Sequence, residues 1–176
     1  MSNASTRKII RDGAIVEDDW TLIAADDVGD LPAGKLIVPL KLWLRSSPAL
    51  MARGEPIGIW FDGHDDVSVL ADNIETIPLI AIRFPKLADG RGYSTAAMLR
   101  TRYGFKGELR AIGDVLRDQI FYMQRVGFNA FSVRDDKDIG DALKALTDFS
   151  ETYQGSTDQP VPLFRRRMTN SPARPA

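Results

Sequence analysis

The sequence predicts an α/β domain with a mostly parallel sheet of about five strands, helices on both faces of the sheet and a short N-terminal antiparallel hairpin. Two observations predict this class. Short apolar runs alternate with amphipathic runs from residue 36 to residue 149, and consecutive strands are separated by segments long enough for one helix. Antiparallel neighbours could be joined by a much shorter turn, so these strands are expected to pair in parallel.

A partial barrel of the TIM type is the alternative architecture. A closed barrel of eight strand-helix units would need roughly 250 residues, and the chain has 176. An open sheet is therefore preferred to a closed barrel. In either arrangement the loops after the strands are expected to open on one edge of the sheet.

The central stretch, residues 80–133, contains three of the strands. They are expected at residues 80–84, 108–113 and 128–133. Each of these runs is short and apolar, as in a strand buried on both faces. The segments between them show helical spacing, for example in Leu116, Ile120 and Met123, and Gly104 and Gly127 are natural stops for the two helices.

Other elements are expected on both sides of this stretch. Asp12-Gly13 between two apolar runs is a hairpin signal, and residues 20–23 could extend that antiparallel flap. Pro39 cannot donate to a ladder, so its strand is expected at an edge of the sheet or at the entry to a helix. A further strand is expected at residues 57–61, and a last helix after residue 138.

The composition changes after Tyr153. Residues 1–154 are expected to form the single domain, and residues 155–176, rich in proline and with little to bury, are expected to be disordered. Arg165-Arg166-Arg167 forms a small basic cluster in this tail. Simple solvation is the favoured interpretation of the cluster, and contact with an acidic partner or with nucleic acid is the alternative.

Composition also excludes several classes of function. The chain has no cysteine, which excludes disulfides, thiol catalysis and iron-sulfur ligation by its own residues. His64 is the single histidine, so no metal site is expected, and a role as a general base is less favoured than that of an ordinary loop residue. The net charge of −1 gives no general attraction to nucleic acid. No leader opens the chain and no apolar run approaches the roughly 20 residues of a membrane span, so we expect a cytoplasmic protein without membrane contact.

Charged residues follow each central strand, at the edge where the carboxyl ends of parallel strands meet. Ligands of open parallel sheets bind in the crevice beyond this edge, and helices that begin there present N–H groups, so we expect a small anion. The loop containing Arg91, Gly92 and Ser94 has the parts of an anion cradle: backbone donors, a guanidinium and a hydroxyl. Helix capping by Ser94 and a left-handed bend at Gly92 are the alternatives.

Two further arginines and two aspartates complete the candidate site. Arg83 interrupts an apolar strand, and a buried guanidinium is costly unless it meets a carboxylate or a ligand. An ion pair with Asp114 or Asp89 ranks slightly above a ligand contact. Arg117 opens a helix, where a cation opposes the helix dipole, so a partner for it is expected. Asp114 and Asp118 are the candidate catalytic residues, with helix capping as the alternative role for Asp114.

Four segments of the chain resemble a known family. They are Ile-Ala-Ile-Arg-Phe-Pro-Lys (80–86), Asp-Gly-Arg-Gly-Tyr-Ser (89–94), Gly-Glu-Leu-Arg-Ala-Ile-Gly-Asp-Val-Leu-Arg-Asp-Gln (107–119) and Arg-Val-Gly-Phe-Asn-Ala-Phe (125–131). With them, residues 8–154 resemble the bacterial domain-of-unknown-function family 934. Members of that family are commonly labelled as an oxidoreductase of sulfite reduction. The resemblance therefore implies a role in sulfate assimilation and cysteine biosynthesis.

Two functions of different class fit these expectations. In the first, the chain is an enzyme or redox subunit of the sulfite-reducing system. Arg83, Arg91 and Arg117 then hold a sulfur oxyanion or a phosphate-bearing cofactor, and Asp114 or Asp118 handles protons. In the second, a non-catalytic accessory protein docks on sulfite reductase and uses the same edge for a regulatory anion or an acidic patch of its partner. The accessory role is favoured, turnover of a substrate stays open, and no cofactor is identified.

Overall fold

The structure is a computed structural model that describes residues 7–24, 30–85, 90–148 and 152–169. Within these residues eight strands form one sheet in the order β2-β1-β8-β7-β6-β5-β4-β3. The strands are β1 Lys8–Arg11, β2 Ala14–Glu17, β3 Trp20–Leu22, β4 Lys35–Pro39, β5 Ile57–Asp62, β6 Leu79–Phe84, β7 Glu108–Gly113 and β8 Ala130–Phe131. All neighbours from β3 to β8 are parallel, which confirms the mostly parallel sheet but with more strands than predicted.

The predicted hairpin is present at one edge of this sheet. β1 and β2 pair antiparallel around Asp12 and Gly13, whose φ angles of 50° and 79° are the left-handed values of a tight hairpin turn. β1 also pairs antiparallel with β8, so the hairpin extends the sheet. β3 does not extend the hairpin as predicted, because it pairs in parallel with β4 at the opposite edge.

The helices follow the strands in sequence. They are α1 Leu40–Met51, the 3₁₀ helix η1 Val67–Thr76, α2 Arg91–Thr101, α3 Arg117–Arg125, α4 Ile139–Lys144, the short 3₁₀ turn η2 Ala145–Thr147 and α5 Leu163–Thr169. The predicted entry from Pro39 into a helix is confirmed, since Pro39 ends β4 and directly precedes α1.

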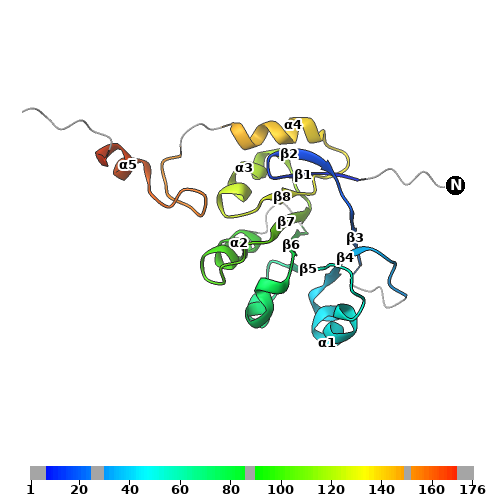
Figure 1. The fold of residues 1–176 in the computed structure, drawn as a ribbon. Helices are drawn as coiled ribbons and strands as arrows, with labels where there is room; N and C mark the ends of the chain where they lie inside the picture. The colour runs from blue at the N-terminus through cyan, green and yellow to red at the C-terminus, as the bar shows by residue number, and fades with distance from the viewer. Residues whose placement is uncertain (1–6, 25–29, 86–89, 149–151, 170–176) are drawn as a thin grey trace, which may run out of the picture.

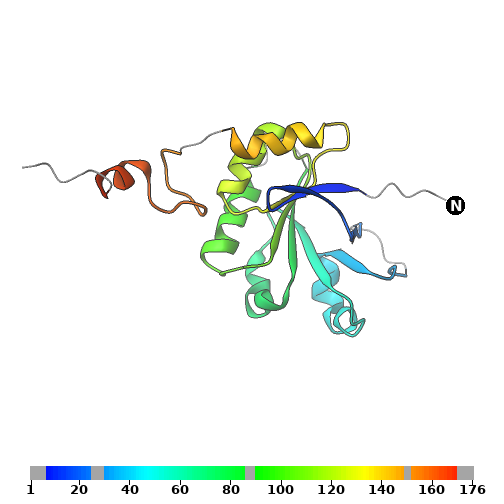
Figure 2. The ribbon, with the colours of Figure 1, turned by 45° about the horizontal axis from the view of Figure 1, so that its top comes forward.

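The sheet curls into a half-barrel, and the helices from α1 to α4 lie around its outer face (Figures 1 and 2). The prediction of helices on both faces is therefore wrong, and the alternative of a partial barrel fits. The strand order explains the difference. β4 to β8 are adjacent in the order of the sequence, so every crossover advances in the same direction and returns on the same side. A doubly wound sheet needs a reversal of strand order, which this sheet lacks among its parallel strands.

Alternate residues of each strand serve the two faces. In β6, Ile80 and Ile82 belong to the large core beneath the helices. Leu79 and Ala81 belong to a smaller cluster on the inner face, which also contains Trp60. Arg83 follows Ala81 by two residues, so its side chain is also on the inner face. It lies near the end of β6, at the edge of that face.

Two residues on either side of β3, Asp18 and Ile23, contact the inner face. Arg110 of β7 is 1% exposed there, and its Nη1 donates to both oxygens of Asp18 at 2.9 and 3.0 Å. Its Nε donates to Glu108 at 2.7 Å. The indole nitrogen of Trp60 donates to the carbonyl of Ile23 at 2.7 Å. These contacts bury polar groups of β5 and β7 on the inner face.

Residues 155–176 were expected to be disordered, and their described part, residues 155–169, contains α5. Residues 154–157 are held against the end of α3 because the side chain and carbonyl of Arg125 bond to Gln154, Ser156 and Thr157. Residues 170–176 lie outside the described residues. In the described part of the chain, no helix combines the length and apolar character needed to span a membrane.

Candidate functional site

The carboxyl ends of β4 to β8 meet at one rim of the half-barrel, as the parallel pairing requires. Arg83 lies at the centre of this rim. It pairs in register with Asp62, the last residue of β5, so the two side chains leave neighbouring strands at the same level. In barrels of parallel strands this end is where catalytic and binding residues gather.

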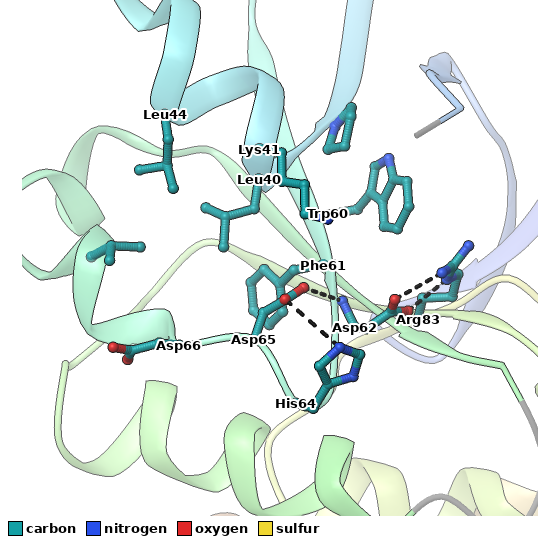
Figure 3. A pocket seen from close by; sticks show the side chains of 12 residues that line it. Leu40, Lys41, Leu44, Trp60, Phe61, Asp62, His64, Asp65, Asp66 and Arg83 are labelled. Carbon is teal, nitrogen blue, oxygen red and sulfur yellow. Dashed lines mark hydrogen bonds and ion pairs between the residues drawn. The ribbon is translucent and has the colours of Figure 1, made fainter. Parts of the chain in front are cut away.

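Arg83 is held by a carboxylate and an aromatic ring (Figure 3). Its Nε and Nη2 donate to the two oxygens of Asp62 at 2.6 and 2.8 Å, a bidentate pair. Its guanidinium carbon lies 4.7 Å from the ring centre of Trp60. The hydrogen bonds with Asp62 raise the pKa of Arg83 above its usual value. The side chain stays 41% exposed, so the guanidinium is fixed in place but within reach of a ligand.

A cavity of about 350 Å³ opens on one side of Arg83, between α1 and η1, and we call it the α1–η1 cavity. It is lined by Pro39, Leu40, Lys41, Leu44, Trp60, Phe61, Asp62, His64, Asp65, Asp66, Val69 and Arg83. Figure 3 shows the apolar side chains of Leu40 and Leu44 on one wall and the aspartates of the loop after β5 on the other. The cavity therefore combines an apolar wall with charges of both signs.

The three aspartates of this cavity also shape its loop. Asp62 holds Arg83, and Asp65 Oδ2 accepts from the backbone N–H of Asp62 at 2.9 Å. Asp66 caps η1 by accepting from the N–H of Ser68 at 2.9 Å, and its hydrogen bonds with Ser68 lower its pKa. His64 Nε2 lies 4.0 Å from Asp65 Oδ1. The loop is thus tied together by its own carboxylates.

A second cavity, of about 440 Å³, opens on the other side of Arg83, and we call it the β6–β8 cavity. It is lined by Arg83, Phe84, Pro85, Gly113, Asp114 and Arg134. Arg134 Nη1 donates to Asp114 at 2.8 Å, and the rest of its fork donates to Asp136 at 2.5 and 2.8 Å. The hydrogen bonds from Arg134 lower the pKa of Asp136 to about 2. Two guanidiniums and one carboxylate therefore face this cavity.

The predicted anion loop lies at the start of α2, which begins at Arg91. Ser94 is consequently inside the helix and does not cap it, because the helix starts four residues earlier than its capping would need. Arg91 and Ser94 are exposed. Gly92 is buried, and a Cβ there would lie 2.7 Å from the ring of Phe84. The structure thus gives Gly92 a packing role.

Arg117 and Asp118 are in the first turn of α3, in the outer layer. Arg117 has the partners that the helix dipole argument predicted: Asp141 at 3.2 Å and Asp148 at 3.0 Å. Asp118 is exposed. The pKa of Tyr93 is raised first by the burial of Tyr93 and then by the negative charge of Asp118. Neither residue lines the two rim cavities, so the structure does not bring Arg117 together with Arg83.

Asp114 and Arg83 do lie at the same cavity, but they are not paired with each other. The structure gives Asp62 as the partner of Arg83, whereas Asp114 accepts from Arg134. Asp89, the other predicted partner, lies outside the described residues. Asp114 does not cap a helix, because α3 begins only at Arg117. The prediction that Arg83 meets a carboxylate is confirmed, with a different carboxylate.

The sequence analysis missed Trp60, Asp62 and Lys41 as parts of the rim, whereas it placed Arg134 at this edge, after the last central strand, without assigning it to the site. The sequence did contain a signal for Trp60 and Asp62. They are two residues apart, so they share a face of β5. Asp62 also lies at the end of its strand, as Arg83 nearly does in the next strand. No comparable signal marks Lys41. Among the residues that the structure describes, no group of three or more histidines or carboxylates is placed to hold a metal ion.

Comparison with known protein families gives a match. The model of a family described as "Bacterial protein of unknown function (DUF934)" matches residues 58–164. The matched region contains both Asp62 and Arg83 and extends through β8 and into α5. No curated protein matches the chain.

Proposed function

This chain belongs to the DUF934 family of bacterial proteins of unknown function, and we propose that it serves assimilatory sulfite reduction as an accessory protein that binds a small oxyanion at the rim. The resemblance set out above supports the pathway, because members of that family carry the sulfite-reduction label. The chemistry of the β6–β8 cavity supports the ligand class. Sulfite reductase is the partner that this proposal implies.

One observation carries the ligand class: Arg83 and Arg134 line the same cavity, where Asp114 is the one carboxylate among the described residues. Guanidinium groups present several N–H donors in one plane and match the oxygens of sulfur and phosphorus oxyanions. The cavity thus has more positive than negative groups.

The neighbouring carboxylates decide how strongly such an anion binds. Asp62 and Asp136 occupy part of each guanidinium fork, and Asp114 faces the cavity itself. A bound oxyanion shares its arginines with them, so the affinity is modest and falls as salt screens the charges. In this arrangement Asp114 is the group placed to exchange a proton with the ligand, whereas Asp118 is in the outer layer.

Binding is tested by isothermal titration calorimetry of the full chain with sulfite, sulfate and phosphate. Arg83→Gln and Arg134→Gln should each weaken binding about tenfold or more, because a charge-assisted hydrogen bond contributes about 1.5–3 kcal/mol. Asp114→Asn should strengthen binding, because it removes the competing carboxylate. Trp60 beneath Arg83 provides a second signal, its fluorescence, in a chain where Trp20 and Trp43 are replaced by phenylalanine.

Arg102→Gln is the matched control, because Arg102 is also exposed and stacked on a ring, Tyr103 at 5.6 Å, but lines neither rim cavity. The ligand proposal fails if no oxyanion binds the wild-type chain at millimolar concentration. It also fails if the control loses as much affinity as the rim variants.

The pathway is tested separately, by growth on sulfate as the sole sulfur source. Cells without this chain should grow poorly and recover with the wild-type chain but not with the double variant Arg83→Gln/Arg134→Gln. Sulfite reduction by the purified reductase, with and without this chain, then distinguishes an accessory protein from an enzyme. Turnover of sulfite by this chain alone would favour the oxidoreductase alternative, in which a bound cofactor carries the electrons because the chain has no cysteine.

A further inference from the structure

The end of the described chain is anchored at its base and projects from the body of the protein. The carbonyl of Arg125 accepts hydrogen bonds from Ser156 Oγ at 2.6 Å and from the N–H of Thr157 at 3.1 Å. Arg125 Nη2 donates to the carbonyl of Gln154 at 2.5 Å. Beyond this anchor, α5 lies away from the sheet and from the other helices in both views (Figures 1 and 2).

α5 exposes side chains that proteins usually bury in contacts. Phe164 is 49% exposed, and Val161, just before the helix, is 49% exposed as well. Arg165 stacks on the ring of Phe164 at 5.8 Å. Aromatic residues and arginine dominate the energetic centres of protein interfaces. An isolated helix of seven residues is too short to be stable by itself in water, so a partner surface would stabilise α5.

The α1–η1 cavity is complementary to these side chains. Its apolar wall includes Leu44 and Val69, which are 55% and 45% exposed. Three aspartates line it against two permanently charged cations, Lys41 and Arg83, so its net charge is opposite to that of the arginines of α5. A phenylalanine side chain and an adjacent guanidinium thus find both an apolar wall and carboxylates there.

The two surfaces cannot meet within one chain. α5 lies beyond α2 and α3, whereas α1 lies at the other end of the curled sheet (Figures 1 and 2). We propose that α5 of one copy docks in the α1–η1 cavity of a second copy, with Phe164 against Leu44 and Val69 and Arg165 facing Asp65 and Asp66. This contact joins two different surfaces. Exchanged reciprocally by two copies it gives an isologous two-fold pair, and otherwise it is heterologous and builds a larger assembly. It does not depend on the oxyanion at the β6–β8 cavity.

Sedimentation of the full chain over a range of concentrations tests this contact. The wild-type chain should associate reversibly. Arg165→Glu, which reverses the charge of α5, and Leu44→Lys, which puts a cation into the cavity, should each weaken association about tenfold or more. Both positions are exposed, and circular dichroism confirms that each variant is folded. Phe164→Ala should act like Arg165→Glu.

Mixing the two variants gives the sharper result. Arg165→Glu keeps an intact cavity and Leu44→Lys keeps an intact α5, so an equimolar mixture should associate although each variant alone does not. Met51→Lys is the matched control, because Met51 is exposed on the same helix but does not line the cavity. A wild-type chain that stays monomeric overturns the proposal. So does association that is unchanged by Leu44→Lys and Arg165→Glu, or that is lost equally in Met51→Lys.

Discussion

Arg83 is both a member of an ion pair and a candidate ligand for an anion. Its ion pair with Asp62 and its stacking on Trp60 account for a cation at the end of an apolar strand. The pair is partly exposed, however, and exposed ion pairs contribute only about 0–1 kcal/mol to stability. The main effect of Asp62 and Trp60 is therefore to fix the direction of the guanidinium, which is what an anion site requires.

Gly92 carries a prediction about stability. Gly92→Ala should lower the free energy of unfolding by about 1–3 kcal/mol, because the new methyl group would lie 2.7 Å from the ring of Phe84 and 3.2 Å from Ile82 in a filled core. Urea denaturation of the two chains measures the difference.

Gly90→Ala is the control two residues earlier. None of the described residues beyond its chain neighbours has an atom within 4 Å of a Cβ at Gly90, and its φ of −74° suits alanine. The control should change the free energy of unfolding by less than about 0.5 kcal/mol. If Gly92→Ala proved as harmless but weakened oxyanion binding, the cradle role predicted from the sequence would replace the packing role.

At the scale of the elements, the helix beginnings decide which charges reach the rim. α2 begins at Arg91 and α3 at Arg117, so the first turns of both helices lie in the outer layer and not over the inner face. Arg117 then pairs with Asp141 of α4 and with Asp148 just after η2. The carboxylates of these neighbouring elements therefore offset the unfavourable interaction of Arg117 with the dipole of its own helix.

Arg117→Ala should therefore weaken the packing of α3 on α4 without affecting the rim. Both partners are exposed, so the free energy of unfolding should fall by less than about 1 kcal/mol, and by less still in high salt. Urea denaturation at two salt concentrations measures this change. Oxyanion affinity, from calorimetry, should equal that of the wild-type chain; a loss as large as that of Arg83→Gln would return Arg117 to the site.

At the scale of the whole molecule, the helices from α1 to α4 lie around the outside of the curled sheet and leave its inner face to other parts of the chain. The segment around Asp18 closes it, through the buried pair of Asp18 with Arg110. Arg110 comes from β7 and Asp18 from the connection before β3, so this pair joins parts of the sheet that are 92 residues apart in sequence.

Asp18→Ala should strongly destabilise the fold. It leaves the guanidinium of Arg110, 1% exposed, without its long-range partner, and removal of one member of a buried pair costs about 3–5 kcal/mol. We expect about 3 kcal/mol, the lower end of that range, because Glu108 still accepts from Arg110. Asp19→Ala, which removes an exposed pair with Lys35, should cost less than about 1 kcal/mol. Thermal and urea unfolding of both variants measure the difference, and equal costs would show that the buried pair does not close the fold.

The sequence by itself determined the class and most of the elements. Periods of two and of about 3.6 residues are local properties, so the strands at residues 80–84 and 108–113 and the hairpin at Asp12-Gly13 were predicted correctly. The expectation that charges collect at one rim also followed, from parallel pairing alone. It identified Arg83 and Asp114 as neighbours of one cavity.

Only the tertiary structure decided which of those charges face one another. Strand order and curl placed Asp62 beside Arg83 and Arg134 beside Asp114, and they placed Arg117 in the outer layer. These pairings join residues about 20 or more positions apart in the sequence. Such contacts form only when the strands assemble into the sheet. A local sequence pattern does not specify which distant residues meet. For this reason the position of the helices and the partners of each site residue could be read only from the tertiary structure.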